Sequence, residues 1–496
     1  MSVTDSPAAT AGHRTGRWID DWRPEDPEFW ESTGRPIARR NLTWSILAEH
    51  LGFSVWLFWS VSAALLAKMG FEFSVSQLFF LVAVPNLVGS LLRLPYTFAV
   101  PRFGGRNWTV VSALLLLVPT LLFAVAVQHP GTPYWAFVLI SATAGVGGGN
   151  FASSMANINF FYPAKRKGLA LGLNAAGGNI GVAVLQLGLP VVVGGAGLFG
   201  LVAASAGGIH LERAGYLYAA LAVVAALMAF LLMDNLTSAR SNARDVAAVV
   251  KHKHTWVMAL LYIGTFGSFI GYSAAMPLLI KLEFYVPTPL PAGTGINFAY
   301  YAFLGALVGS ITRPFGGWLA DKYGGARVTL VTFGVMILGT LGVLVTLAQL
   351  TPNPTQDPAI ATANTSTFPW FLAAFLVVFA ATGIGNGSTY KMIPAIWRTE
   401  AERGTRAGTT ERDAALLAGT KQASAAIGVI GAVGALGGFL IPIAFSSPWV
   451  DNPLSATKGA FMAFTAFYLV CALVTWGVFL RKPAAAKATS LAGSRI

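Results

Sequence analysis

The sequence predicts an all-α membrane protein with twelve transmembrane helices in two pseudo-symmetric six-helix halves. Three observations support this prediction: an apolar composition, twelve long apolar segments, and an internal repeat between the two halves. The chain has 496 residues, of which 55% are hydrophobic and 11% are charged. Because soluble proteins carry about 25% charged residues, most of this chain belongs in lipid.

Each of the twelve apolar segments is long enough to cross the hydrocarbon core of a bilayer, which needs about 20 residues. The expected spans are 41–68, 75–100, 107–128, 133–161, 167–194, 214–234, 255–281, 297–320, 327–350, 367–397, 414–444 and 457–480. The resulting parts of the chain are an N-terminal arm (1–40), a first half (41–234), a middle loop (235–254), a second half (255–480) and a tail (481–496).

The positive charges predict the orientation in the membrane. Of the 33 lysines and arginines, 25 lie in the arm, in the tail and in the loops on the same side of the membrane as the arm and the tail. The opposite loops hold only Lys68, Arg213, Lys281 and Lys458. Because positive loops stay in the cytoplasm, we expect both termini to be cytoplasmic and the protein to lie in the inner (plasma) membrane. The net charge of +13 is spread over short loops, so it does not indicate a nucleic-acid partner.

The repeat places one arginine in an apolar segment of each half. Gly-Ser-Leu-Leu-Arg-Leu-Pro-Tyr at 89–96 aligns without a gap with Gly-Ser-Ile-Thr-Arg-Pro-Phe-Gly at 309–316. A guanidinium at mid-bilayer depth costs roughly 2.5–3.5 kcal/mol. Arg93 and Arg313 could each pair with a buried carboxylate, but no acidic residue lies inside either segment. We favour the alternative, in which the two arginines share a bound anion.

A parallel repeat of two six-span halves is the plan of the major facilitator superfamily, whose substrate site lies between the halves near the midplane. The loop after the second copy, Gly-Gly-Trp-Leu-Ala-Asp-Lys-Tyr-Gly-Gly-Ala-Arg at 316–327, resembles the cytoplasmic gating motif of that superfamily. Its candidate gating residues are Gly316, Asp321, Gly324 and Arg327. The glycines allow close helix approach, and Asp321 can pair with a neighbouring basic group or a helix N-terminus.

Two glycine-rich stretches, at 144–181 and 383–394, stand out within the spans. Glycine costs about 1 kcal/mol relative to alanine in a helix, but in membranes it lets helices pack closely. Close packing explains the glycines without any functional role. It does not explain the asparagines of the first stretch, since amides in lipid need partners or a wet cavity. These are Asn150, Asn157, Asn159, Asn174 and Asn179.

These stretches resemble the paired signatures of the nitrate/nitrite porters, a branch of the major facilitator superfamily. The resemblance extends from Asp-Trp-Arg-Pro-Glu-Asp-Pro at 21–27 to Gly-Gly-Phe-Leu-Ile-Pro at 437–442. It implies that Arg93 and Arg313 clamp the substrate and that Asn179 is a polar site residue. It also implies that three aromatic residues sandwich the ion. These are Phe151, Tyr262 and Phe266. By themselves these aromatics would be read as core packing.

Nitrate suits such a site because it is flat and singly charged. A guanidinium offers bidentate, charge-assisted hydrogen bonds in a rigid plane, whereas lysine offers a point charge. Aromatic faces would exclude tetrahedral sulfate or phosphate, and nitrite should also fit. Two arginines facing each other repel, so we expect the loaded protein to reorient more readily than the empty one. The resulting hypothesis is nitrate uptake in exchange for nitrite.

Four ionisable residues leave an alternative mechanism open. Glu49 and His50 lie in the first span, Lys391 lies in the second signature, and Lys421 lies near the start of the eleventh span. A carboxylate beside a histidine is a reasonable proton site. A lysine at position 391 looks more like the proton-coupled nitrate importers of the same family. In the structural alternative, Glu49 pairs with a lysine or both residues face the cytoplasmic vestibule.

Other function classes are less consistent with the sequence. A nitrate sensor would need a signalling domain, and the arm and the tail are short. The loops show no metal cluster, nucleotide-binding loop or nucleophile–base pair, so we expect no enzyme activity, cofactor or metal. A facilitator for a different anion remains possible. By analogy with the superfamily, we expect a functional monomer in the lipid bilayer.

Overall fold

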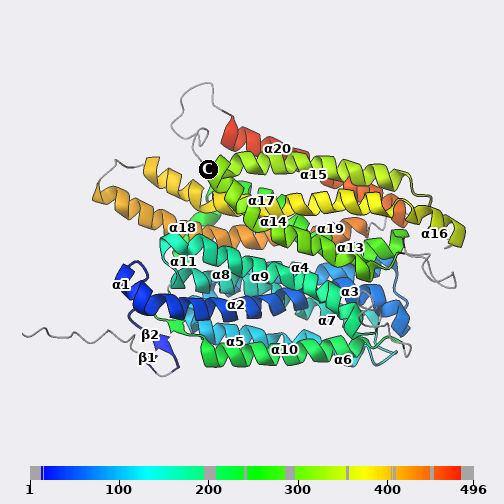
Figure 1. Cartoon of the computed structure of the whole chain (residues 1–496), viewed down its shortest axis with the longest axis horizontal. Helices are drawn as coiled ribbons and strands as arrows, with labels where there is room; N and C mark the ends of the chain where they lie inside the picture. The colour runs from blue at the N-terminus through cyan, green and yellow to red at the C-terminus, as the bar shows by residue number, and fades with distance from the viewer. Residues whose placement is uncertain are drawn as a thin grey trace, which may run out of the picture.

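The computed structural model of the chain is a bundle of long helices that run side by side (Figure 1). The structure describes residues 13–14, 16–194, 208–239, 243–284, 296–352, 357–403, 405, 409–446, 452–481 and 496. Most of the expected tail, 481–496, therefore lies outside the described residues. The chain is all-helical apart from three two-residue strands within these ranges.

The helices of the first half follow the six expected spans. The first helical run extends from Pro27 to Met69, which is further toward the N-terminus than the apolar segment at 41–68. Hydropathy does not detect this extension because its residues are polar, but Asp26 caps the helix start and Pro27 occupies the first turn. The elements are α1 (Pro27–Phe29), η1 (Trp30–Gly34), α2 (Arg35–Trp56), α3 (Phe58–Leu65), η2 (Leu66–Met69), α4 (Val75–Phe103), α5 (Gly105–Leu115), α6 (Leu117–Ala126), α7 (Tyr134–Thr143), α8 (Gly145–Phe161), α9 (Ala164–Val192) and α10 (Leu211–Leu232).

The second half repeats the pattern after a short helix in the middle loop. Its elements are α11 (Ala243–Val250), α12 (Lys253–Tyr262), η3 (Ile263–Gly267), α13 (Ser268–Phe284), η4 (Phe298–Tyr300), α14 (Ala302–Tyr323), α15 (Gly325–Ala348), α16 (Pro358–Thr365), α17 (Phe368–Arg403), α18 (Thr410–Ala435), α19 (Gly437–Phe445), α20 (Pro453–Thr475) and η5 (Trp476–Leu480). Eleven helical runs of the described chain are long and apolar enough to span a membrane. The twelfth, α14, is 22 residues long but carries Arg313 and two charged residues at its end, which lower its mean hydropathy.

The internal repeat is visible in the backbone. Helix α4 ends before Gly104 and α14 ends before Gly324, and the next helix begins one residue later in both halves. The two glycines adopt nearly the same left-handed conformation, with φ of +88° and +90°. This φ is strained for any residue with a Cβ atom, so the glycine at each copy of the turn is required by its geometry.

The two halves pack against each other along α4 with α18 and α19, and along α9 with α14. Polar contacts also cross between the halves. Ser76 Oγ donates to Ser446 O at 2.9 Å, and Gln186 Nε2 donates to Ser273 O at 2.6 Å. Lys281 Nζ donates to Ala64 O at 2.6 Å. The predicted twelve-helix fold in two halves is confirmed.

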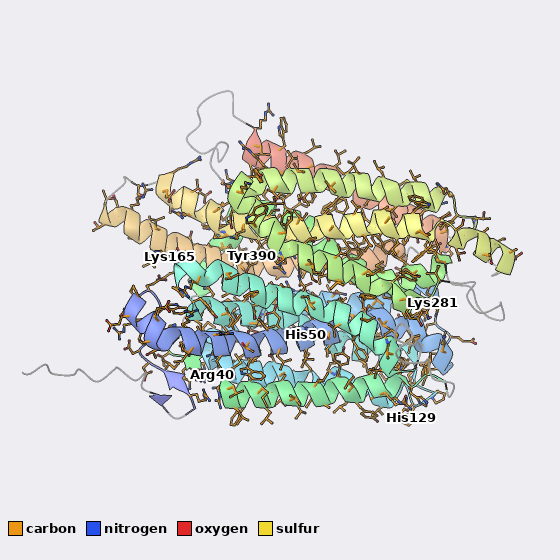
Figure 2. All side chains as sticks on the ribbon, viewed as in Figure 1. Arg40, His50, His129, Lys165, Lys281 and Tyr390 are labelled. Carbon is orange, nitrogen blue, oxygen red and sulfur yellow. The ribbon has the colours of Figure 1, made fainter. Side chains whose placement is uncertain are left out.

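The N-terminal arm forms a small structured cap at one end of the bundle, which we call the arm end. Strand β2 (Trp18–Ile19) pairs antiparallel with β1 (His13–Arg14) and parallel with β3 (Asn235–Leu236). The buried carboxylate of Asp234 binds Arg17 at 3.0 Å and Arg40 at 2.7 Å. Figure 2 places Arg40 and Lys165 at this end, and His129 and Lys281 at the opposite end.

Candidate functional site

Arg93 lies at the centre of the bundle and contacts both halves. It is fully buried in α4. Its Nε donates to Gly148 O in α8 at 3.2 Å, and its Nη1 donates to Gly431 O in α18 at 3.0 Å. Its guanidinium carbon lies 4.7–5.2 Å from the ring centroids of Trp56, Phe151 and Phe266. The remaining nitrogen, Nη2, has no hydrogen-bond partner among the described residues.

Arg313 approaches the same place from α14 in the second half. Its side chain is buried, and its guanidinium carbon lies 5.7 Å from the ring centroid of Phe151 and 5.8 Å from that of Tyr390. Its Nη1 also has no hydrogen-bond partner in the described part of the chain. The structure thus brings the two repeat-related guanidinium groups to one aromatic ring, and each keeps an N–H group free for a ligand.

The three aromatic residues expected at the site form one stack. Tyr262 and Phe266 are separated by 5.2 Å between ring centroids and 15° between planes. Phe266 and Phe151 are separated by 6.0 Å and 23°. Phe151 belongs to α8 of the first half and the other two to the second half, so the stack crosses between the halves. The wider helical turn of η3 lies between Tyr262 and Ser268, where it sets the direction of Phe266.

Asn179 is fully buried in α9, and both polar atoms of its side chain lack a hydrogen-bond partner among the described residues. Gln186 lies two helical turns further along the same face and bonds to Ser273 of the second half. This face of α9 therefore points toward the other half, where α9 packs against α14. Asn386 in α17 is likewise buried with both amide atoms unpartnered.

Buried polar atoms normally have hydrogen-bond partners, and a buried donor left unsatisfied costs about 1–3 kcal/mol. Around the aromatic stack, the unpartnered groups among the described residues are the guanidinium nitrogens of the two arginines and the hydroxyl of Tyr262. Most of them can donate hydrogen bonds, and two carry positive charge. A small anion would satisfy such a set.

Comparison with known proteins agrees with this chemistry. Residues 50–410 match the Major Facilitator Superfamily. The chain is 40% identical over 470 residues to the nitrate/nitrite transporter NarU of Escherichia coli (strain K12), covering 94% of this chain and 96% of that protein. It is 35% identical over 487 residues to the probable nitrate/nitrite antiporter NarK2 of Thermus thermophilus, covering 95% and 98%. The chain belongs to the nitrate/nitrite porters of the major facilitator superfamily.

The fold is shared with more distant transporters. A crystal structure of a D-xylose–proton symporter superimposes on the porter with a TM-score of 0.59, covering 89% of this chain and 97% of that one. The two sequences are 15% identical, so this likeness concerns the fold alone. The superfamily match and the eleven apolar helical runs of membrane length in the described chain make the porter a multi-pass membrane protein.

Two residues around the site of the porter were not anticipated from the sequence. Tyr390 packs against Arg313, and Trp56 packs against Arg93 while its Nε1 donates to Pro85 O at 2.9 Å. Tyr390 belongs to the second glycine-rich stretch, next to Lys391, so its position in that signature was an available signal. Trp56 gave no such signal, because a tryptophan within an apolar span is usually interpreted as a packing residue.

Glu49 of the porter lies close to the arginine pair. It is fully buried in α2 and accepts hydrogen bonds from Ser154 Oγ and from Asn174 Nδ2, the latter at 2.5 Å. Its other oxygen has no partner among the described residues, and its charge interacts with those of both Arg93 and Arg313. The ion pairs found in the described ranges include no lysine on Glu49.

The other three candidate coupling residues lie elsewhere. His50 is half-buried, with Nδ1 at 3.1 Å from Gly177 O (Figure 2). Lys391 pairs with Asp321 of the gating motif, with Nζ–O distances of 2.8 and 2.9 Å, and both side chains are partly exposed. Lys421 is exposed on α18. Of the four, only Glu49 is placed to sense the charge of the central site.

The gating motif lies where α14 meets α17. Gly316 packs against the backbone of Ile384, leaving no space for a Cβ atom. Gly324 forms the turn into α15, and Arg327 is exposed just beyond it. Lys391 also lies close to Gly168 of α9, in the first half. The Asp321–Lys391 pair is thus placed at a contact between the halves, toward the arm end.

Proposed function

We propose that this porter exchanges nitrate for nitrite across the bacterial inner membrane, with one anion held between Arg93 and Arg313. The observation that carries the proposal is the convergence of two buried guanidinium groups on Phe151, each with a free N–H group. The names of the relatives NarU and NarK2 support nitrate and nitrite as the substrates.

The geometry of the site suits a flat monovalent anion. Each guanidinium can offer a planar pair of donors to one edge of the anion. The rings of Phe151 and Phe266, the first of which faces both cations, form an apolar wall beside the site. A tetrahedral oxyanion would project an oxygen into that wall, and would lose hydration without a matching donor. Asn179 is the candidate for a further neutral donor.

Repulsion between the two arginines supplies a reason for exchange. Two unit charges about 8 Å apart at an effective dielectric constant of 20 repel by roughly 2 kcal/mol. A bound anion removes this repulsion and allows the halves to close around it. An empty site resists closure, so the porter changes back to its first conformation only when it carries an anion in the opposite direction.

Counterflow in proteoliposomes tests this mechanism. Vesicles loaded with nitrite should take up external nitrate rapidly, and vesicles without an internal permeant anion should take up little. Sulfate should not compete in either case. Equal nitrate uptake into loaded and unloaded vesicles would contradict obligatory exchange, and uptake inhibited by sulfate but not by nitrite would contradict the assigned substrates.

A second candidate mechanism is proton-coupled uptake, and the position of Glu49 favours it. With Glu49 ionised, the two arginines and the carboxylate leave one net positive charge, which a single anion neutralises. Protonation of Glu49 would raise the net charge by one and would strengthen anion binding. Recording the external pH during nitrate uptake separates the two mechanisms, because symport removes protons from the medium and exchange does not.

We further propose that both termini are cytoplasmic and that the porter works as a monomer. The arm end carries most of the positive loops, which supports its placement on the cytoplasmic side. On this side the Asp321–Lys391 pair would help close the cytoplasmic entrance. Labelling of single cysteines introduced into opposite loops tests the orientation.

A further inference from the structure

We infer that His252, His254 and Glu400 form a binding site for a divalent transition-metal ion at the arm end of the second half. The ligand atoms of the three side chains all lie within 4.8 Å of one another. Glu400 Oε2 is 3.1 Å from His252 Nε2, and Glu400 Oε1 is 2.9 Å from His254 Nδ1. This inference is independent of the proposed transport mechanism.

The three residues come from different elements that are held in place by their own contacts. His252 lies in the turn between α11 and α12, where Thr255 Oγ1 donates to Val249 O at 2.7 Å. His254 lies in the first turn of α12, and Glu400 lies near the end of α17. The imidazole of His252 packs on the ring of Trp397 at 5.3 Å between centroids. The cluster is therefore prearranged by the fold.

The cluster is also incompletely satisfied by hydrogen bonds. His254 is 4% exposed, and its Nδ1 has no hydrogen bond among the described residues although Glu400 Oε1 lies nearby. Nδ1 of His252 is buried and unpartnered as well, although its Nε2 faces the carboxylate. A buried imidazole nitrogen aimed at a carboxylate without a proper hydrogen bond is well placed to act as a metal ligand.

The ligand set determines the class of ion. Two imidazoles and one carboxylate suit Zn²⁺, Co²⁺, Ni²⁺ or Cu²⁺, whereas Mg²⁺ and Ca²⁺ prefer oxygen ligands only. In a tetrahedral zinc site, ligand atoms stand about 3.3 Å apart, as follows from Zn–ligand distances near 2.0 Å. The two imidazole nitrogens face different oxygens of Glu400, at 3.1 and 2.9 Å. Small side-chain rotations would bring both nitrogens and one of these oxygens around one ion, and water would fill the fourth position.

A bound ion would connect the start of α12 to the end of α17. Without an ion, the imidazoles connect these elements through contacts with the carboxylate of Glu400 and through the packing of His252 on Trp397, and Glu400 and His252 are both partly exposed. Coordination bonds would replace these contacts with a stiffer link. We therefore expect metal binding to raise the unfolding temperature of the protein.

The test is a calorimetric titration with Zn²⁺ of the full chain in detergent, after EDTA has removed any bound metal. One ion should bind per chain, Mg²⁺ should not bind, and Co²⁺ should give the visible absorption of a tetrahedral site. The variants Glu400→Gln and His254→Asn should each weaken Zn²⁺ binding more than tenfold, since even outer-sphere changes weaken such sites by 10–100-fold. The matched control is His210→Asn, which removes a histidine paired with one carboxylate, Glu212, at 3.1 Å.

Zn²⁺ binding that is absent in the unmodified porter, or equal in Glu400→Gln and the unmodified porter, would overturn the inference. Glu400 is partly exposed, so this variant is expected to fold even where His254→Asn is not. Thermal unfolding of each variant without metal checks this directly. Weakened binding in His210→Asn alone would place the ion at the other histidine and would also contradict the proposed site.

Discussion

Replacing Arg313 with lysine separates the positive charge of the clamp from its geometry. The structure places this guanidinium against Phe151 and Tyr390, with Nη1 unpartnered among the described residues. Lysine keeps the charge but loses the planar fork. Hydrogen bonds to charged groups contribute about 1.5–3 kcal/mol each. Loss of one of two such bonds to nitrate should therefore cost about 2 kcal/mol, which is roughly a 30-fold weaker apparent affinity.

The assay is nitrate/nitrite counterflow in proteoliposomes, with the apparent KM measured at constant pH. The matched control is Arg102→Lys, because Arg102 lies on the same helix as Arg93 but is exposed at the arm end. That variant should leave the KM unchanged. Arg93→Lys should be more damaging than Arg313→Lys, since Arg93 also bonds to Gly148 and Gly431 across the halves. A KM for Arg313→Lys within about threefold of the unmodified value, a change of only ~0.7 kcal/mol, would refute bidentate clamping.

Three further predictions follow from the same structure. Glu49→Gln keeps the side-chain size and the contacts with Ser154 and Asn174. It should therefore preserve counterflow but remove any pH dependence of nitrate affinity. An unchanged pH profile in uptake assays would exclude Glu49 as the proton site. Asp321→Asn and Lys391→Met should each change the uptake rate only modestly, because a partly exposed ion pair contributes about 0.2–1 kcal/mol. The double variant should have the same uptake rate as each single variant. Additive effects on this rate would show that the two residues do not act as a pair. Gly104→Ala should lower thermal stability more than Gly324→Ala. Both positions have positive φ, but only at Gly104 would a Cβ atom overlap the side chains of Trp18 and Asn235. Equal unfolding temperatures of the two variants in a fluorescence melt would contradict this prediction.

The fold was predictable because its signals are local and repeated. Apolar segments of membrane length predicted twelve spans. Eleven of them correspond to helical runs of the described chain that are long and apolar enough to span a membrane, and the twelfth corresponds to α14. The turn at Gly104 and Gly324 was visible in the sequence as an aligned glycine pair. The helix start at Pro27 was not predicted, because polar residues extend a helix without a hydrophobic signal.

The candidate site was predictable only where placing a residue in the membrane carried an unusual free-energy cost. A buried arginine in each half required an explanation, and the repeat related the two. Trp56 has no such cost and could not be distinguished from a packing residue, and the only signal for Tyr390 was its position in the second glycine-rich stretch. Lys391 was grouped with the coupling candidates from its place in a signature, yet its side chain reaches Asp321 instead, which depends on the rotation of α17 against α14. In the cluster of His252, His254 and Glu400, the glutamate lies far in sequence from the two histidines, so no spacing pattern revealed the full set.

The hydrogen bonds of Glu49 bear on how protonation and movement could be connected. Both of its partners, Ser154 and Asn174, belong to the first half, as does Arg93. If the halves rock as rigid bodies, the distance from Glu49 to Arg93 stays constant while the distance to Arg313 changes. Of the interactions of Glu49 with the two arginines, only the one with Arg313 then depends on conformation, so we expect coupling of protons to transport to depend on that arginine. Proton-coupled uptake that survived replacement of Arg313 by a neutral residue of similar size, such as methionine, would contradict this reasoning.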